Sequence, residues 1–73
     1  MKIEFGDKLK QQRLTKQVTQ KQIAEYLEVT PVTVQRFEYG IRRPSLDNIA
    51  KLCEYFNISA DYLLGLSDDS ERH

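Results

Sequence analysis

The chain has 73 residues, of which 11 are basic and 11 acidic, so it has no formal net charge and room for one small domain with a single core. Because the chain has only one cysteine, Cys53, and one histidine, His73, it cannot form an intrachain disulfide or a metal site built from these residue types. No apolar run can span a bilayer and residues 1–4 do not resemble a signal peptide, so we expect a cytoplasmic protein without a membrane partner.

The first predicted helix covers residues 4–15. Phe5 and Leu9 are four residues apart, and Arg13 continues the same face by another four. The spacing therefore predicts that Arg13 lies on the inward face of this helix.

The second predicted helix begins after Thr19, which is a good N-cap residue. Gln22 follows three residues later, which is the pattern of a capping box. Ile23, Ala24 and Leu27 share one face and predict a buried surface. The small Ala24 is suited to a close crossing with another helix.

The third predicted helix follows a turn of only three residues. Thr30 is its expected N-cap, and Pro31 occupies its first position, where the missing N–H has no cost. Val34 and Phe37 are expected to face inward, and Gly40 ends the helix. Two short helices joined this tightly form a sharp corner, the local pattern of a helix-turn-helix.

Residues 41–44 are predicted to be a loop with two adjacent cations. Ser45 caps a fourth helix that ends near Asn57 and whose apolar face comprises Ile49, Leu52, Cys53 and Phe56. On this face we expect Cys53 to be a buried, inert thiol, with a redox-sensing role as the less favoured alternative.

Ser59 is expected to cap a short fifth helix that carries Tyr62, Leu63, Leu64 and Leu66. A domain is therefore predicted over residues 1–66, followed by a polar tail over residues 67–73. The sequence lacks a Gly-rich phosphate loop, a nucleophile with a histidine base and metal-ligand spacing. We expect neither an enzyme nor a cofactor or small-molecule ligand.

The charges are unevenly distributed along the chain. Residues 1–44 hold nine basic and five acidic residues, a net charge of +4, whereas residues 45–73 hold two and six, a net charge of −4. Such a chain can present a basic face to nucleic acid while its other end repels it.

The twenty residues 20–39 carry a recognisable pattern. Ala24 occupies the fifth place, and the apolar places are filled by Ile23, Leu27, Val29, Val34 and Phe37. Together with the segments 37–45 and 57–64, this pattern resembles the lambda-repressor-like helix-turn-helix family, which includes the Cro/repressor and XRE-type regulators. The resemblance implies a compact, all-α, five-helix DNA-binding domain. Its helix-turn-helix would be formed by the second and third helices.

Two positions depart from the family pattern. Glu28 stands at the corner, where the family often has Gly, and would be strained if the backbone there requires a positive φ. Pro31 and Val32 begin the third helix, where polar residues are common. Hydrogen bonding to bases is therefore expected to be reduced at these two positions.

The function that the resemblance implies is sequence-specific binding of double-stranded DNA by a transcriptional regulator, expected to be a repressor. Its third helix would enter the major groove, and a homodimer would read a palindromic operator. The candidate base contacts are Val32, Thr33, Gln35 and Arg36. Val32 would pack on a thymine methyl group. Arg36 would bind guanine or hold a phosphate, and Gln35 would reach adenine or a phosphate.

The candidate phosphate contacts are Gln20, Lys21, Thr30, Tyr39, Arg42 and Arg43. By resemblance, Gln20 clamps a phosphate and Arg13 forms a partly buried ion pair with Glu38. The candidate dimer contacts are Tyr62, Leu64 and Leu66, although closure of the core would explain them equally well. The alternative function is a protein-interaction module of the same fold, such as an antitoxin or an adaptor, which the zero net charge slightly favours.

Overall fold

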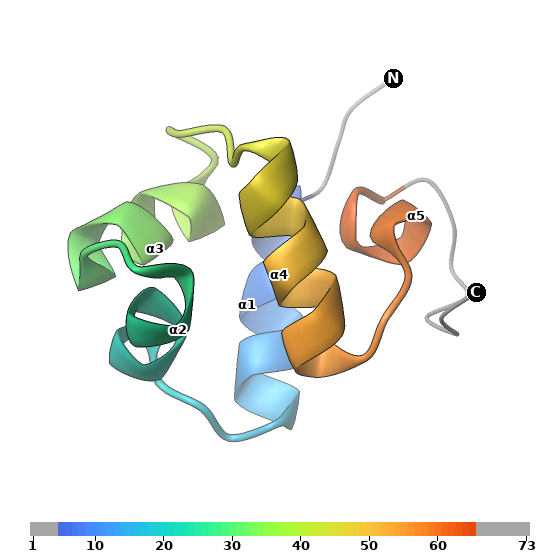
Figure 1. The fold of residues 1–73 in the computed structure, drawn as a ribbon, viewed down its shortest axis with the longest axis horizontal. Helices are drawn as coiled ribbons and strands as arrows, with labels where there is room; N and C mark the ends of the chain where they lie inside the picture. Colours follow the sequence, from blue (N-terminus) through green and yellow to red (C-terminus); the bar gives the residue numbers. More distant parts are fainter. Residues whose placement is uncertain (1–4, 66–73) are drawn as a thin grey trace.

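The computed structural model describes residues 5–65, which form five α-helices and no strand (Figure 1). The helices are α1 (Phe5–Thr15), α2 (Gln20–Leu27), α3 (Pro31–Tyr39), α4 (Leu46–Phe56) and α5 (Ala60–Leu63). The predicted all-α, five-helix architecture is therefore confirmed. The predicted start of the first helix at Glu4, the residue Leu66 and the tail 67–73 lie outside the described residues.

The helices surround one core. In Figure 1, α4 crosses in front of α1, the pair α2 and α3 lies on one side, and α5 lies on the other. Helix α1 packs against α3 and α5, and α4 packs against α2 and α5. Among residues 5–65, no helix is long and apolar enough to cross a membrane.

The core is formed by the residues that the helical spacing predicted to face inward. Ile23, Ala24 and Leu27 of α2 are buried, as are Val34 and Phe37 of α3. The other buried apolar residues are Phe5, Leu9, Leu52, Cys53, Phe56, Ile58 and Leu63. The corner between α2 and α3 is thus held by side chains from both helices and by the helices that cover them.

Four helices begin at a hydroxyl residue whose side chain accepts the backbone N–H three residues later. These N-caps are Thr19, Thr30, Ser45 and Ser59, as the sequence predicted. At Thr19 the capping box is complete, because the side chain of Gln22 also accepts the backbone N–H of Thr19 at 2.8 Å. The starts of these helices are therefore fixed locally.

The corner residue Glu28 adopts a left-handed conformation, with φ of 61° and ψ of 42°. Its N–H bonds to the carbonyls of Ala24 and Glu25, which ends α2. The sequence expectation of strain at Glu28 is therefore met, because a residue with a Cβ is disfavoured at this φ.

Gly6 allows α1 to approach the end of α3 closely. A Cβ at this position would lie 2.5 Å from the backbone oxygen of Glu38 and 2.7 Å from that of Phe37. Both neighbours are backbone atoms, so they cannot move aside like a flexible side chain. The glycine thereby sets the distance between α1 and α3.

Candidate nucleic-acid interface

The outward face of α3 is opposite to its buried face. Val32 is 51% exposed and Arg36 is exposed, whereas Val34 and Phe37 are buried. Thr33 lies at one edge of this face and is half-buried. Gln35, also half-buried, lies at the other edge. The structure thus brings all four predicted base-contacting residues onto one side of α3.

Thr30 and Thr33 form a hydroxyl pair at the start of α3. The Oγ1 atom of Thr30 accepts the backbone N–H of Thr33 at 3.2 Å. The same atom lies 2.9 Å from Oγ1 of Thr33, within hydrogen-bonding distance. The pair joins a predicted phosphate contact, the exposed Thr30, to a predicted base contact, the half-buried Thr33. This bond was not predicted from the sequence.

Gln20 begins α2 and connects it to α3. Its Nε2 atom donates to Oε1 of Glu38 at 3.1 Å, a contact that sequence reasoning missed. A glutamine amide has two N–H donors, so one remains for another acceptor. Lys21, the next residue, is exposed beside it.

Glu38 is the acceptor that ties three helices together. Arg13 of α1 donates to it through Nε at 2.7 Å and through Nη2 at 3.2 Å. The side chain of Glu38 is only 3% exposed and that of Arg13 is 15% exposed. This two-pronged ion pair, with the third bond from Gln20, holds α1, α2 and α3 in fixed register behind the outward face of α3.

The loop after α3 carries the remaining predicted phosphate contacts. Tyr39, Arg42 and Arg43 are all exposed. The N–H groups of Ile41 and Arg42 bond to the carbonyl of Arg36, at 3.0 and 3.3 Å, and keep the loop close to the end of α3. The loop cations are therefore carried by the same helix that presents the outward face.

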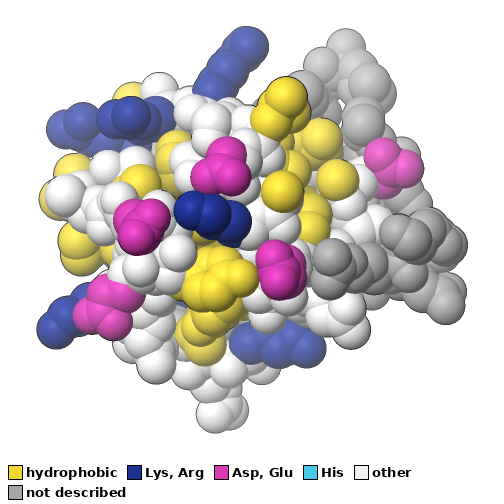
Figure 2. All heavy atoms as spheres, viewed as in Figure 1, with side chains coloured by type: hydrophobic (Ala, Val, Ile, Leu, Met, Phe, Trp, Pro, Cys, Tyr) yellow, Lys and Arg dark blue, Asp and Glu magenta, His cyan; other side chains and the backbone are white. Residues whose placement is uncertain are grey.

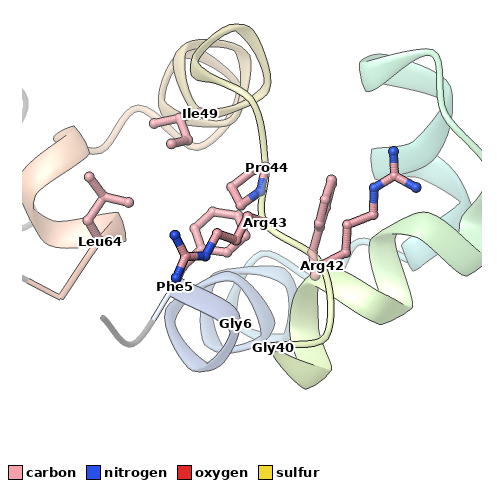
Figure 3. Close-up of a pocket in the computed structure, with 9 residues that line it drawn as sticks. Phe5, Gly6, Gly40, Arg42, Arg43, Pro44, Ile49 and Leu64 are labelled. Carbon is pink, nitrogen blue, oxygen red and sulfur yellow. The ribbon is translucent and has the colours of Figure 1, made fainter. Parts of the chain in front are cut away.

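The two arginines of this loop differ in direction. Figure 3 shows the guanidinium of Arg42 extending to the side where α2 and α3 lie, whereas that of Arg43 turns back across Phe5. Both line a hollow of about 410 Å³ together with Phe5, Gly6, Phe37, Gly40, Pro44, Ile49 and Leu64. Arg42 is thus the arginine that accompanies α3, a distinction that the sequence could not make.

Charges of both signs cover the face over α2 and α4. Lys51 lies 3.3 Å from Asp47 and 4.0 Å from Glu28. In Figure 2, acidic and basic side chains are mixed over this face, while basic side chains project at the edge beside the α3–α4 loop. Within residues 5–65, no group of His, Cys, Asp and Glu is arranged to hold a metal ion.

Comparison with known proteins decides the family. A family model described as helix-turn-helix matches residues 9–63, most of the chain. The chain belongs to the helix-turn-helix family. This membership confirms the resemblance to lambda-repressor-like regulators on which the fold and the site were predicted.

Two named relatives have this helix-turn-helix domain as part of a longer chain. The transcriptional regulator ImmR of Bacillus subtilis is 35% identical over 69 residues, which are 94% of this chain and 54% of ImmR. The transcriptional activator BcrR of Enterococcus faecalis is 34% identical over 62 residues, 85% of this chain and 30% of BcrR. The chain thus spans about half or less of the length of these two relatives.

A solved structure of a transcriptional regulator from Listeria innocua has the same helix-turn-helix architecture. It superposes with a TM-score of 0.86 at 29% identity, covering 89% of this chain and 61% of that one. The agreement extends over nearly all the described helices. It therefore places α2 and α3 of this chain in the arrangement of that regulator.

The residues predicted for a dimer interface have contacts within the chain. Tyr62 is half-buried: its ring lies under Lys8, with Nζ 4.7 Å from the ring centroid, and its hydroxyl is 3.4 Å from Nε2 of Gln12. Leu64 is half-buried and lines the hollow, and Leu66 lies outside the described residues. Tyr62 therefore helps to close α5 onto α1, one of the two roles that its sequence position allowed.

Proposed function

We propose that this protein is a sequence-specific, double-stranded-DNA-binding transcriptional regulator that places α3 in the major groove. The observation that carries the proposal is the outward face of α3, where Val32 and Arg36 are exposed. Gln20 at the start of α2 is bonded to Glu38 of α3, and the basic α3–α4 loop follows directly after α3. A helix presented in this way fits the width of the major groove.

The centre of the face is assigned to base contacts. Val32 has no hydrogen-bonding group, so its exposed methyl groups are suited to the methyl group of thymine. Arg36 can bind the two acceptors of guanine with its planar guanidinium. We assign it this role instead of the phosphate contact, because only a base contact distinguishes one DNA sequence from another. Gln35 and Thr33 lie at the edges and reach bases that flank those two.

The phosphate contacts are assigned to the starts of α2 and α3, the end of α3 and the loop that follows it. The second N–H of the Gln20 amide can donate to a phosphate while Glu38 holds the first. The other contacts are assigned to four exposed residues, Lys21, Thr30, Tyr39 and Arg42. Arg43 is assigned a weaker phosphate contact because its guanidinium turns back across Phe5.

A single domain of this size buries little surface on DNA, so we propose that two copies bind a palindromic operator as a homodimer. Their half-sites would be about 34 Å apart, one turn of the double helix. Of the three candidate contacts, Leu64, which lines the hollow, is assigned to the interface, because the ring and hydroxyl of Tyr62 already contact α1; Leu66 stays a prediction from the sequence. Repression would follow from occupation of the promoter, and a reporter gene with the operator upstream tests the sign of regulation.

The function is tested by selecting bound duplexes from a random DNA pool. The proposal predicts one enriched half-site, repeated with two-fold symmetry at a fixed spacing. Arg36→Ala should change the selected sequence, whereas Lys10→Ala, which removes an exposed cation of α1 outside the proposed interface, should not. A pool without enrichment, together with a co-purifying protein partner, would contradict the proposal and favour an antitoxin or adaptor.

A further inference from the structure

The two N-caps of the helix-turn-helix differ at their third residue. At α2 the side chain of Gln22 reaches back to the backbone N–H of Thr19, which is 2.8 Å away. At α3 the third residue is Thr33, and its hydroxyl meets the hydroxyl of Thr30 at 2.9 Å instead. The cap of α3 is therefore joined to the edge of its outward face by a hydrogen bond between two hydroxyl groups.

The bonds of this pair restrict where its protons can lie. A hydroxyl has one O–H donor and two lone pairs. Thr30 already uses one lone pair to accept the N–H of Thr33. If Thr33 donates to Thr30, both lone pairs of Thr30 are used and its O–H points elsewhere. If Thr30 donates to Thr33, Thr30 has no proton left for a third group and Thr33 has one to give.

A phosphate oxygen accepts hydrogen bonds and cannot donate them, so it distinguishes these two arrangements. A phosphate at Thr30 requires the O–H of Thr30. The proton between the two hydroxyls must then come from Thr33. Contact with the DNA backbone thereby leaves Thr33 with lone pairs and a methyl group, and without a hydrogen to donate.

We propose that the Thr30–Thr33 pair couples backbone contact to base reading, so that Thr33 selects a base whose exocyclic amine lies in the major groove. In the major groove, adenine presents its N6 amine and cytosine its N4 amine as donors, whereas guanine and thymine present acceptors at the corresponding positions. Thr33 therefore accepts from adenine or cytosine and disfavours guanine and thymine. The inference rests on the proposed DNA-binding function and names what one of its base-contacting residues recognises.

The test uses the site that the wild-type protein selects and three variants. Thr33→Val keeps the shape of the side chain and removes its acceptor. Thr30→Ser keeps the cap hydroxyl and is the matched control. Thr30→Ala removes that hydroxyl and with it the restriction on Thr33. Because Thr30→Ala also removes an N-cap, its folded fraction is measured by far-ultraviolet circular dichroism at the temperature of the binding assay.

The position read by Thr33 is the one whose base preference differs between wild type and Thr33→Val. In this base pair the adenine or cytosine, whichever strand carries it, is replaced by an analogue that lacks the exocyclic amine. Wild type and Thr30→Ser should lose about five- to tenfold in affinity, the effect of one hydrogen bond, and Thr33→Val less than about twofold. Thr30→Ala should accept guanine or thymine at the same position, because Thr33 is then able to donate.

Equal losses for wild type and Thr33→Val would overturn the inference, as would unchanged selectivity in folded Thr30→Ala. Either result leaves the proposed function standing, since the wild-type protein would still select a site. A wild-type protein that shows no salt-sensitive preference for any duplex would instead overturn the proposed function, and the inference with it.

Discussion

Removing the positive charge of Arg13 should destabilise the domain strongly, because Arg13 neutralises a buried carboxylate. In Arg13→Met the Glu38 carboxylate loses two of its three hydrogen bonds while its side chain stays 3% exposed. A buried ion pair broken on one side costs about 3–5 kcal/mol. The remaining bond from Gln20 and the partial exposure of Arg13 place the expected loss near 3 kcal/mol, at the lower end of that range.

The loss is measured by urea denaturation and by thermal unfolding followed by circular dichroism. For a domain of this size each kcal/mol shifts the melting temperature by about 4–8 °C, so a decrease of about 12–24 °C is expected. Lys51→Met is the matched control, because it breaks pairs with Asp47 and Glu28, whose carboxylates are exposed, and these pairs should contribute less than about 1 kcal/mol.

The double variant Arg13→Met/Glu38→Leu tests the reason for the loss. If an unpaired buried carboxylate is responsible, replacing both charges by apolar side chains should recover much of the stability. A loss in Arg13→Met no larger than in Lys51→Met, or a double variant whose loss is the sum of the two single losses, would refute the reasoning.

Three further predictions follow from the backbone and the loop. Gly6→Ala should lower the free energy of unfolding, measured by urea denaturation, by about 2 kcal/mol or more, because the added Cβ would meet the backbone oxygens of Phe37 and Glu38. An unchanged urea midpoint would contradict the close approach of α1 to α3. Glu28→Gly should raise the melting temperature by a few degrees, worth about 0.5–1 kcal/mol, because glycine adopts φ of 61° without strain, while Glu28→Ala should gain nothing. Arg42→Ala should reduce the slope of log affinity against log salt by about 1 and should weaken binding to all duplexes alike. Arg43→Ala should change this slope less, because the guanidinium of Arg43 turns back across Phe5. Equal changes in slope for the two variants would show that the directions of the two guanidinium groups are irrelevant.

Most of the fold could be predicted because its signals are local. The four hydroxyl N-caps and the inward face of each helix depend on residues three or four apart, and all were found where the sequence placed them. The positive φ of Glu28 was anticipated from the family pattern. The left-handed Gln17, with φ of 58°, had no such signal, since neither a glycine nor an asparagine marks that turn.

The site was harder to predict because its decisive contacts depend on tertiary packing. The residues of the outward face follow from helical spacing alone. The bond from Gln20 to Glu38 joins residues 18 apart, and the bond from Gln12 to Tyr62 joins residues 50 apart. No spacing rule reaches so far. The Thr30–Thr33 bond is local, but the positions fit both a simple cap and a hydroxyl pair, and only side-chain geometry separates them.

In the proposed function, α3 reads the DNA sequence while the surrounding residues hold the DNA backbone. The most direct measurement is the ratio of affinities for the selected operator and for a random duplex, at one fixed salt concentration. Arg36→Ala should reduce this ratio by about tenfold or more, whereas Arg42→Ala should weaken both duplexes and leave the ratio unchanged. A wild-type ratio near one, or an Arg36→Ala protein that keeps the full wild-type ratio, would contradict the account.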